Sequence, residues 1–209
     1  MKAEIIPNEP AILLRGRRKI LLVADLHIGL INFYDKKIIE KLKNLAESVE
    51  ADEVIVLGDL KHRIGRYHKL ERLFDGFGIP LAVVKGNHDG GLDCFEVLSS
   101  KGVRIGKFGL FHGHAMPDDD VMKADTLIFA HAHPSVLIRD DVGGSKERVW
   151  VFGEFDGKKL VIMPAFNDLC ASTPINVERP AGVMFKRWDY RSAEVIMLDG
   201  TYLGCLKLL

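Results

Sequence analysis

The sequence contains little cysteine. Its 209 residues include three cysteines, Cys94, Cys170 and Cys205, and no two of them form a CxxC pair. An odd number at wide spacing argues against a zinc ribbon or a disulfide scaffold. We expect three reduced and mostly buried thiols, as in a protein of the reducing cytoplasm.

Long apolar runs and an excess of one charge are also missing. No stretch approaches the ~20 uncharged residues that a membrane-spanning helix needs, and the charged start Met1–Glu4 does not resemble a secretory signal. We therefore expect a soluble cytoplasmic protein without a membrane partner. The 29 Lys and Arg residues balance 29 Asp and Glu residues, so the overall field does not attract nucleic acid. The sequence does not indicate an oligomeric state.

Apolar strand patterns alternate with amphipathic helix patterns in the first half of the chain. Strands are expected at residues 11–14, 19–24, 53–57 and 80–84, and helices at 35–49, with Asp35 as its N-cap, and at 69–74. From residue 19 the order is strand, helix, strand, helix, strand, which indicates a largely parallel sheet after an antiparallel opening pair.

The second half of the chain is rich in short strand patterns. They lie at residues 103–104, 109–112, 126–130, 135–139, 148–152, 159–163, 182–185, 194–198 and 201–206. We therefore predict an α/β fold, a two-sheet β-sandwich flanked by helices. With 47% hydrophobic residues, the chain suffices for one core. We expect a single domain over residues 1–209, of which about 140–209 form the β-rich C-terminal part.

Five polar clusters follow predicted strands. They are Asp25-Leu26-His27, Gly58-Asp59, Gly86-Asn87-His88-Asp89, His112-Gly113-His114 and His131-Ala132-His133. Ligands of open α/β sheets bind at the carboxyl ends of the strands, so we expect these clusters to converge. In an extended backbone, residues two apart such as Asp25 and His27 point to the same face.

The donor set of these clusters consists of imidazole nitrogens and carboxylate or amide oxygens, without sulfur. Such a set suits two divalent metals side by side, and Asp59 could bridge both with its two oxygens. Each cluster alone could be an ordinary turn or a polar strand end. Their joint occurrence after apolar strands favours a metal site.

The order D-x-H, G-D, G-N-H-D, H-G-H and H-x-H resembles the calcineurin-like metallophosphoesterases, over about residues 19–134. Ala130 stands where that family usually has a glycine. The resemblance implies a dinuclear metal-dependent hydrolase of phosphate esters, in which an activated hydroxide attacks phosphorus. It implies that manganese is the metal, although iron, zinc or nickel would suit the same donors.

The resemblance also implies a role for each site residue. Asp25, His27 and His133 would bind the first metal, Asn87, His112 and His131 would bind the second metal, and Asp59 would bridge them. His88 would contact the phosphate and protonate the leaving oxygen, Asp89 would orient or tune His88, and His114 would be an outer partner of the site.

Three further stretches, at residues 22–29, 111–117 and 163–167, are similar to proteins related to the SbcD nuclease, including ligase-associated endonucleases. This similarity implies a phosphodiesterase or a nuclease acting on DNA. The alternatives are a phosphomonoesterase for a small metabolite or a phosphoprotein, and an inactive scaffold like the retromer subunit with this fold. The presence of His88 and of the full ligand set argues against the scaffold.

A basic segment follows Asp59. It comprises Lys61, His62, Arg63, Arg66, His68, Lys69 and Arg72, with Tyr67 among them. This positive charge could hold a phosphodiester backbone beside the metals, or it could cover a solvated helix. We expect substrate contacts from Lys61, His62, Arg63, His114 and Asn167.

Overall fold

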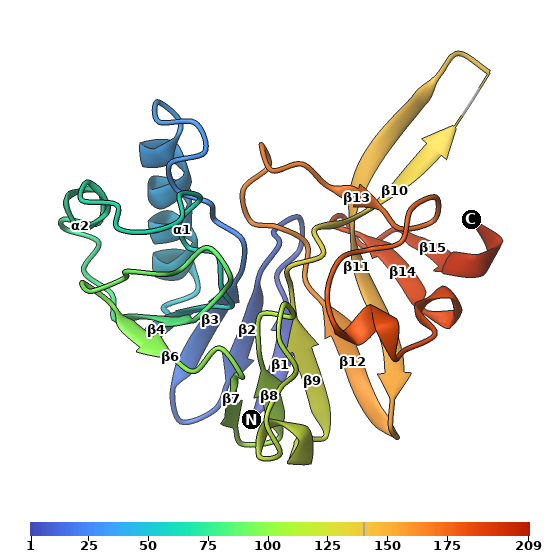
Figure 1. Ribbon diagram of the computed structural model, residues 1–209, viewed down its shortest axis with the longest axis horizontal. Coiled ribbons are helices and arrows are strands. Elements are labelled where there is room, and N and C mark those ends of the chain that lie inside the picture. Colours follow the sequence, from blue (N-terminus) through green and yellow to red (C-terminus); the bar gives the residue numbers. More distant parts are fainter. Residues whose placement is uncertain (140) are drawn as a thin grey trace.

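The computed structural model describes residues 1–139 and 141–209, and two β-sheets form its centre (Figure 1). The first sheet has the strand order β1-β2-β3-β4-β5-β6. Its strands are β1 (Lys2–Ile5), β2 (Ile12–Arg15), β3 (Lys19–Val23), β4 (Glu53–Val56), β5 (Leu81–Val84) and β6 (Glu96–Leu98). Strands β1 to β3 are antiparallel and β3 to β6 are parallel. The predicted opening pair and parallel sheet are therefore confirmed.

The second sheet contains nine strands in the path β13-β10-β11-β12-β9-β8-β7, with β14 beside β11 and β15 beside β14. Its strands are β7 (Val103–Ile105), β8 (Phe108–Leu110), β9 (Thr126–Phe129), β10 (Pro134–Arg139), β11 (Gly144–Phe155), β12 (Lys158–Ile162), β13 (Thr173–Pro174), β14 (Glu194–Met197) and β15 (Tyr202–Cys205). The two sheets and few helices confirm the predicted mixed α/β class.

Alternation along β3 explains how the layers pack. Leu21 and Val23 face the helix α1 (Asp35–Ser48), whereas Ile20 and Leu22 face the second sheet, where they join Trp150 in a shared core. Successive side chains of a strand point to opposite faces, so a strand that is apolar at every position is covered on both sides. The helix α2 (Leu70–Leu73) packs on the same outer layer as α1.

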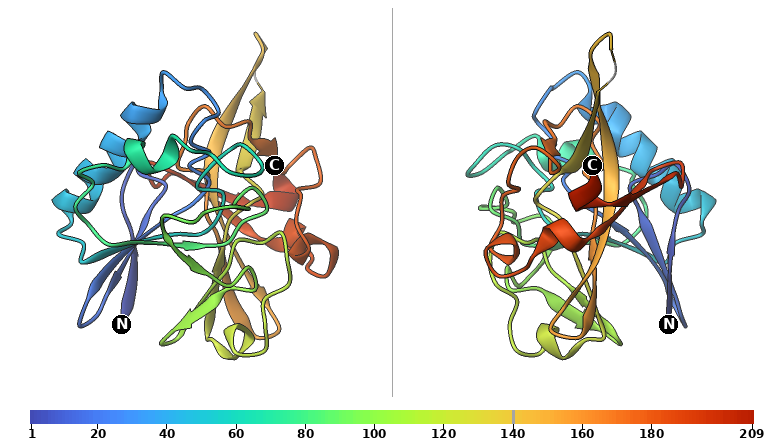
Figure 2. Two further views of the ribbon diagram at one scale, coloured as in Figure 1. Left: turned by 60° about the vertical axis from the view of Figure 1, so that its left-hand side comes forward. Right: turned by 90° about the vertical axis from the view of Figure 1, so that its right-hand side faces the viewer.

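The hairpin of β10 and β11 extends away from the body of the molecule (Figure 2). Strand β11 is twelve residues long. Its first part pairs with β10, and its second part lies between β12 and β14. The second sheet therefore continues beyond the sandwich as a two-stranded ribbon.

Two local predictions were wrong. Residues 182–185 do not form a strand, because Gly182 has a φ of +112° and a 3₁₀ helix, Met184–Lys186, follows. The N-cap of α1 is Tyr34, and Asp35 is the first helical residue. Its carboxylate accepts a hydrogen bond from the backbone N–H of Gly29, 2.8 Å away, so Asp35 braces the loop before the helix.

The prediction of mostly buried cysteines was also wrong. Cys94 is exposed, and Cys170 and Cys205 are partly buried; all three are free. Within residues 1–139 and 141–209, none of the helices has the length and apolar character needed to cross a membrane.

Candidate metal centre

The polar clusters lie at one end of the two sheets, directly after the strands that the sequence predicts. Asp25 follows β3, Asp59 follows β4 and Asn87 follows β5 of the first sheet, whereas His112 follows β8 and His131 follows β9 of the second sheet. Because both sheets end here, side chains far apart in the chain meet in one place.

A first group of side chains surrounds Asp25. The Nε2 atom of His133 lies 3.3 Å from Oδ1 of Asp25 and 3.3 Å from Nε2 of His27. The Nε2 atom of His27 lies 3.7 Å from Oδ2 of Asp59. Oδ1 of Asp25 is buried without a hydrogen-bond donor. Ligand atoms of Asp25, His27 and Asp59 all lie within 4.8 Å of one another.

A second group shares Asp59 with the first. Oδ2 of Asp59 lies 3.3 Å from Nε2 of His112. The same Nε2 atom lies 3.3 Å from Oδ1 of Asn87 and 3.2 Å from Nδ1 of His131. The structure thus brings all seven predicted ligands together, and one carboxylate oxygen faces both groups.

The backbone at these positions is unusual. Eight described residues other than glycine have a positive φ, and five of them belong to the site: Asp25 (+56°), His27 (+46°), Asp59 (+53°), His131 (+68°) and His133 (+43°). The left-handed region costs about 1–3 kcal/mol for such a residue. The backbone is therefore not extended at Asp25, His27, His131 and His133, and paired left-handed turns bring their side chains together.

Two glycines allow the close approach of the loops. A Cβ atom on Gly58 would overlap the ring of His112, and Gly58 has a φ of +83°. A Cβ atom on Gly86 would overlap the carboxylate and the backbone N of Asp59. Glycine is thus required at both positions for steric reasons.

Both carboxylates remain ionised. Burial raises the pKa of Asp25, but the positive charge of His133 beside it brings this pKa below its ordinary value. Burial likewise raises the pKa of Asp59, and the hydrogen bond and charge of His112, with the N–H of His88, hold it well below its usual range. The site therefore keeps two negative charges in a buried setting.

The four imidazoles of the site differ in the direction in which their pKa values are shifted. Burial lowers the pKa of His27 and of His131 to about 4. Burial also opposes protonation of His112 and His133, but Asp59 and Asp25 raise the pKa of His112, and Asp25 raises that of His133 to about 9. Neutral imidazoles and ionised carboxylates are the forms that bind metals.

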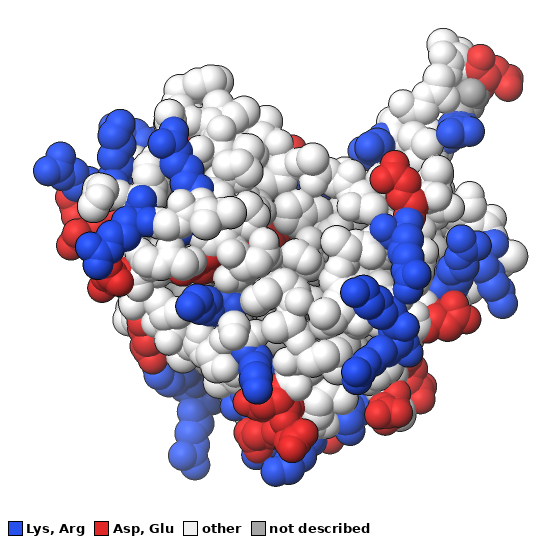
Figure 3. All heavy atoms as spheres, in the orientation of Figure 1, with Lys and Arg blue, Asp and Glu red and all other residues white. Residues whose placement is uncertain are grey.

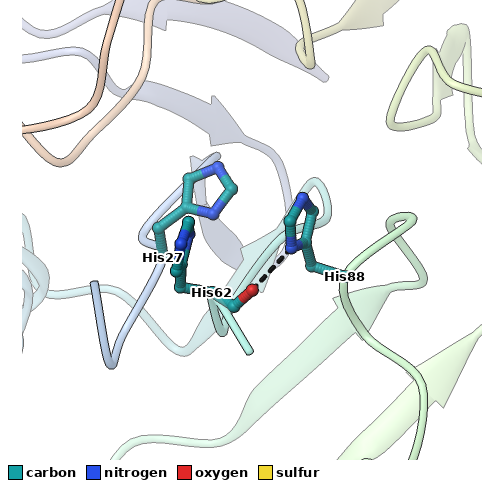
Figure 4. Close-up of side chains that lie close together, drawn as sticks. All are labelled: His27, His62 and His88. Carbon is teal, nitrogen blue, oxygen red and sulfur yellow. Dashed lines mark hydrogen bonds between the residues drawn. The ribbon is translucent and has the colours of Figure 1, made fainter. Parts of the chain in front are cut away.

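A third group contains His27, His62 and His88 (Figure 4). The rings of His62 and His88 are stacked, with centroids 5.5 Å apart. Nδ1 of His88 lies 2.6 Å from the backbone carbonyl oxygen of His62. Since a carbonyl oxygen only accepts, Nδ1 of His88 carries the proton in this hydrogen bond. Nε2 is the ring nitrogen that this bond does not use.

Two residues expected to contact a substrate, Lys61 and Asn167, are buried and bind backbone groups in this structure. Lys61 is fully buried. Asn167 is also buried, its amide N–H donates to the carbonyl of Leu26 at 2.8 Å, and its oxygen accepts from the N–H of Leu169 at 3.0 Å. The polar atoms of Asn167 are therefore used by backbone groups, which hold the loop of Leu26 in place.

Asp89 braces the loops after β4 and β5. Its Oδ2 accepts from the backbone N–H of Asp59 at 2.7 Å and of Gly86 at 2.9 Å, and its Oδ1 accepts from that of Lys61 at 3.4 Å. Burial raises the pKa of Asp89, and the N–H of Gly86 opposes this rise. These contacts position Asp59 beside the loop that carries His88.

The remaining candidates lie around the rim. The ring of His114 is 5.3 Å from that of His112, and burial lowers its pKa. Arg63 is exposed and lies 5.7 Å above the ring of Tyr67. No motif in the sequence singled out Cys170, whose thiol lies within 4.8 Å of ligand atoms of His27 and His133. Burial raises the pKa of this thiol to about 12.

The chain matches one protein-family model and is similar in fold to several solved structures. Residues 18–162 match the family model "Calcineurin-like phosphoesterase". No curated protein matches the chain. Among solved structures, the nuclease MPE of Pseudomonas putida is similar over 95% of this chain and 98% of its own, with a TM-score of 0.65 and 19% identity. The phosphoesterase YfcE of E. coli matches over 88% of this chain and 96% of its own, with a TM-score of 0.43 and 20% identity.

Proposed function

Because the chain belongs to the calcineurin-like phosphoesterase family and is therefore a hydrolase, we propose that it hydrolyses phosphodiesters, including those of DNA, with two divalent metal ions. The observation that carries this proposal is the convergence of two carboxylates, one amide and four imidazoles, with Oδ2 of Asp59 within 3.3 Å of His112 and 3.7 Å of His27.

The residues present fit a pair of metals. Oδ1 of Asp25 is buried without a hydrogen-bond donor, which is costly unless a cation occupies the space before it. Asp25, His27 and His133 would hold one ion, Asn87, His112 and His131 would hold the other, and Asp59 would contact both. When bound, the ions supply positive charge for the phosphate oxygens and acidify a water molecule.

In this proposal manganese is the metal by likeness to the family. Iron, zinc and nickel accept the same donors, because mixed imidazole and carboxylate sets select poorly among these ions.

His88 supplies the proton for the leaving group. In its imidazolium form both ring nitrogens carry protons, and Nδ1–H is held by the carbonyl of His62. Attack of hydroxide forms a new P–O bond and breaks the ester P–O bond, and Nε2–H of His88 passes to the departing oxygen. His62, Arg63 and His114 surround the place where the phosphate would bind.

Basic side chains and the fold favour a diester substrate. On the face shown in Figure 3, Lys and Arg side chains lie over the part that carries α1 and α2 and also over the opposite side of the face, with some Asp and Glu among them, whereas most of the centre is uncharged. Arg63 and Arg66 are exposed in the loop before α2. Such charges hold a phosphodiester backbone without reading its sequence. The Pseudomonas putida protein with this fold is a nuclease.

Turnover of bis(p-nitrophenyl) phosphate with added manganese tests the proposal. We expect hydrolysis by the unmodified protein, none above background in Asp59→Ala, a reduced rate in His88→Ala, and unchanged rates in the control Asp199→Ala, an exposed turn residue. Full activity in Asp59→Ala or His88→Ala would contradict the proposal.

A substrate panel then defines the class. It compares phosphomonoesters, cyclic nucleotides, single-stranded DNA and duplex DNA with several divalent ions. We expect diesters and DNA to be cleaved faster than monoesters. Preference for monoesters would identify a phosphomonoesterase, and metal binding without turnover of any ester would identify an inactive scaffold.

A further inference from the structure

Lys61 lies two residues after Asp59 and is fully buried, with 0% of its surface exposed. A buried ammonium is costly unless its donors are paired. Burial lowers the pKa of Lys61, and the charge of Asp89 opposes this effect. A lysine in such a place needs a specific function, because an apolar side chain would fill the same space at lower cost.

The ammonium group joins two loops. Its Nζ donates to the backbone carbonyl of Arg63 at 2.6 Å and to the backbone carbonyl of His88. The backbone of Lys61 is held in place as well, because it forms a β-bridge with Ile28. The loop after β4 is thereby fastened to the loop after β5 at the residue that carries the imidazole.

His88 is held at three points. Its backbone N–H donates to Oδ1 of Asp59 at 2.9 Å, its carbonyl accepts from Lys61, and its Nδ1–H donates to the carbonyl of His62. The carbonyl of His62, which accepts from the ring of His88, is directly followed in the chain by Arg63. Lys61 binds the carbonyl of Arg63 as well. Lys61 thus sets the separation between the ring of His88 and the carbonyl that fixes its tautomer.

We propose that Lys61 is a positioning residue that fixes His88 as the Nδ1–H tautomer, with Nε2 directed to the substrate. This inference rests on the proposed function, in which His88 protonates the leaving oxygen. When Nε2 of the imidazolium gives up its proton, the neutral ring that remains is the Nδ1–H tautomer. Lys61 therefore favours proton donation from Nε2, because the product of that step already has its hydrogen bond.

The tautomer of His88 in the unmodified, metal-free protein is the first test. Long-range ¹H–¹⁵N correlation spectra at a pH of about 8, where an ordinary imidazole is neutral, distinguish the two tautomers. His88→Gln identifies the signals by their loss. We expect the Nδ1–H tautomer; the Nε2–H tautomer would overturn the proposal without recourse to any variant of Lys61.

The second test replaces the ammonium by an apolar group of similar length. In Lys61→Met we expect His88 to show a mixture of tautomers. Turnover of a phenyl phosphodiester, whose leaving group needs a proton, should fall by about 10²-fold, and turnover of the p-nitrophenyl diester by less than about 5-fold. A merely structural loss would lower both rates equally, which would overturn the proposal.

Lys43→Met is the matched control. Lys43 also donates to a backbone carbonyl, that of Gly76 at 2.7 Å, but it lies on α1. We expect both diesters to be hydrolysed at the unmodified rate. If Lys61→Met does not fold, Lys61→Gln, which keeps a donor, replaces it and should lose less of the phenyl ester activity than His88→Gln.

The outcomes separate the two proposals. Absence of turnover on every ester in the unmodified protein would contradict the proposed function, and the tautomer spectrum would still decide the state of His88. Turnover by the unmodified protein together with an unchanged leaving-group preference in the Lys61 variants would contradict only the role of Lys61.

Discussion

Two segments of this chain have the same form and lie in different sheets. Ala24-Asp25-Leu26-His27 follows β3 of the first sheet, and Ala130-His131-Ala132-His133 follows β9 of the second sheet. In both, the second and fourth residues have a positive φ and the first and third are buried. We call them the first and the second turn segment.

The two segments differ in how they are held. The carbonyl of Leu26 in the first turn segment is bound by the amide of Asn167 at 2.8 Å. The second turn segment is bound by the first itself, because Oδ2 of Asp25 accepts from the backbone N–H of His131 at 3.2 Å. The first segment is therefore braced by Asn167, whereas the second is held by Asp25 of the first segment and, at His133, by the backbone of Ala171 and Thr173.

Replacing the carboxylate that joins the two segments should have the largest effect. In Asp25→Asn we expect turnover to fall by more than about 100-fold, because loss of an outer contact alone costs 10- to 100-fold. Calorimetric titration with manganese should show weaker binding. Asp168→Asn, which alters an exposed acceptor for Tyr34, should change neither quantity. Unchanged turnover in Asp25→Asn would show that the segments act independently.

The next effect tests the close approach of two loops beside the turn segments, the loop after β4 that contains Gly58 and the loop after β8 that contains His112. In Gly58→Ala the added Cβ would overlap His112, whereas Gly157→Ala has a similar φ, +71°, with no atom within 4 Å. We expect Gly157→Ala to lower the free energy of unfolding by about 1–3 kcal/mol and Gly58→Ala to lower it by a further 1–3 kcal/mol or so. Urea denaturation measures both. Equal losses would mean that the His112 ring moves aside without cost.

A smaller effect should come from the brace of the first turn segment. Asn167→Ala removes the amide bound to Leu26, and Asn176→Ala removes a similar amide that binds both backbone groups of Leu137 at 3.0 Å. Each should lower the free energy of unfolding by about 1–3 kcal/mol. Turnover should fall by about 10-fold in Asn167→Ala and stay unchanged in Asn176→Ala. Equal turnover in the two variants would mean that the contact between Asn167 and Leu26 does not position the first turn segment for catalysis.

The smallest effect concerns the alanines that precede each segment. Ala24→Gly and Ala130→Gly should each lower the free energy of unfolding by about 0.5–1 kcal/mol, through the greater freedom of glycine in the unfolded chain. Turnover should remain that of the unmodified protein, because neither alanine has a positive φ. A rise in turnover in Ala130→Gly alone would show that the second segment is restrained by its alanine.

Strand positions and the convergence of the ligands could be predicted from the sequence. Apolar runs such as residues 19–24 predict strands, and the carboxyl ends of parallel strands lie at the same edge of a sheet. The turned backbone could not be predicted, since φ at Asp25 and His131 is set by contacts between sheets. The role of Lys61 was also hidden. Sequence shows that a residue is charged but not which way its side chain points, and the backbone contacts of Asn167 could not be predicted for the same reason.

The metal centre lies across the seam of the sandwich, because Asp25, His27, Asp59 and Asn87 follow strands of one sheet and His112, His131 and His133 follow strands of the other. Under the proposed function, ions bound there would cross-link the two layers. Their binding would then also oppose the separation of the two sheets at that end. Amide hydrogens of β3 and β9 should accordingly exchange with solvent more slowly when manganese is present than after chelation.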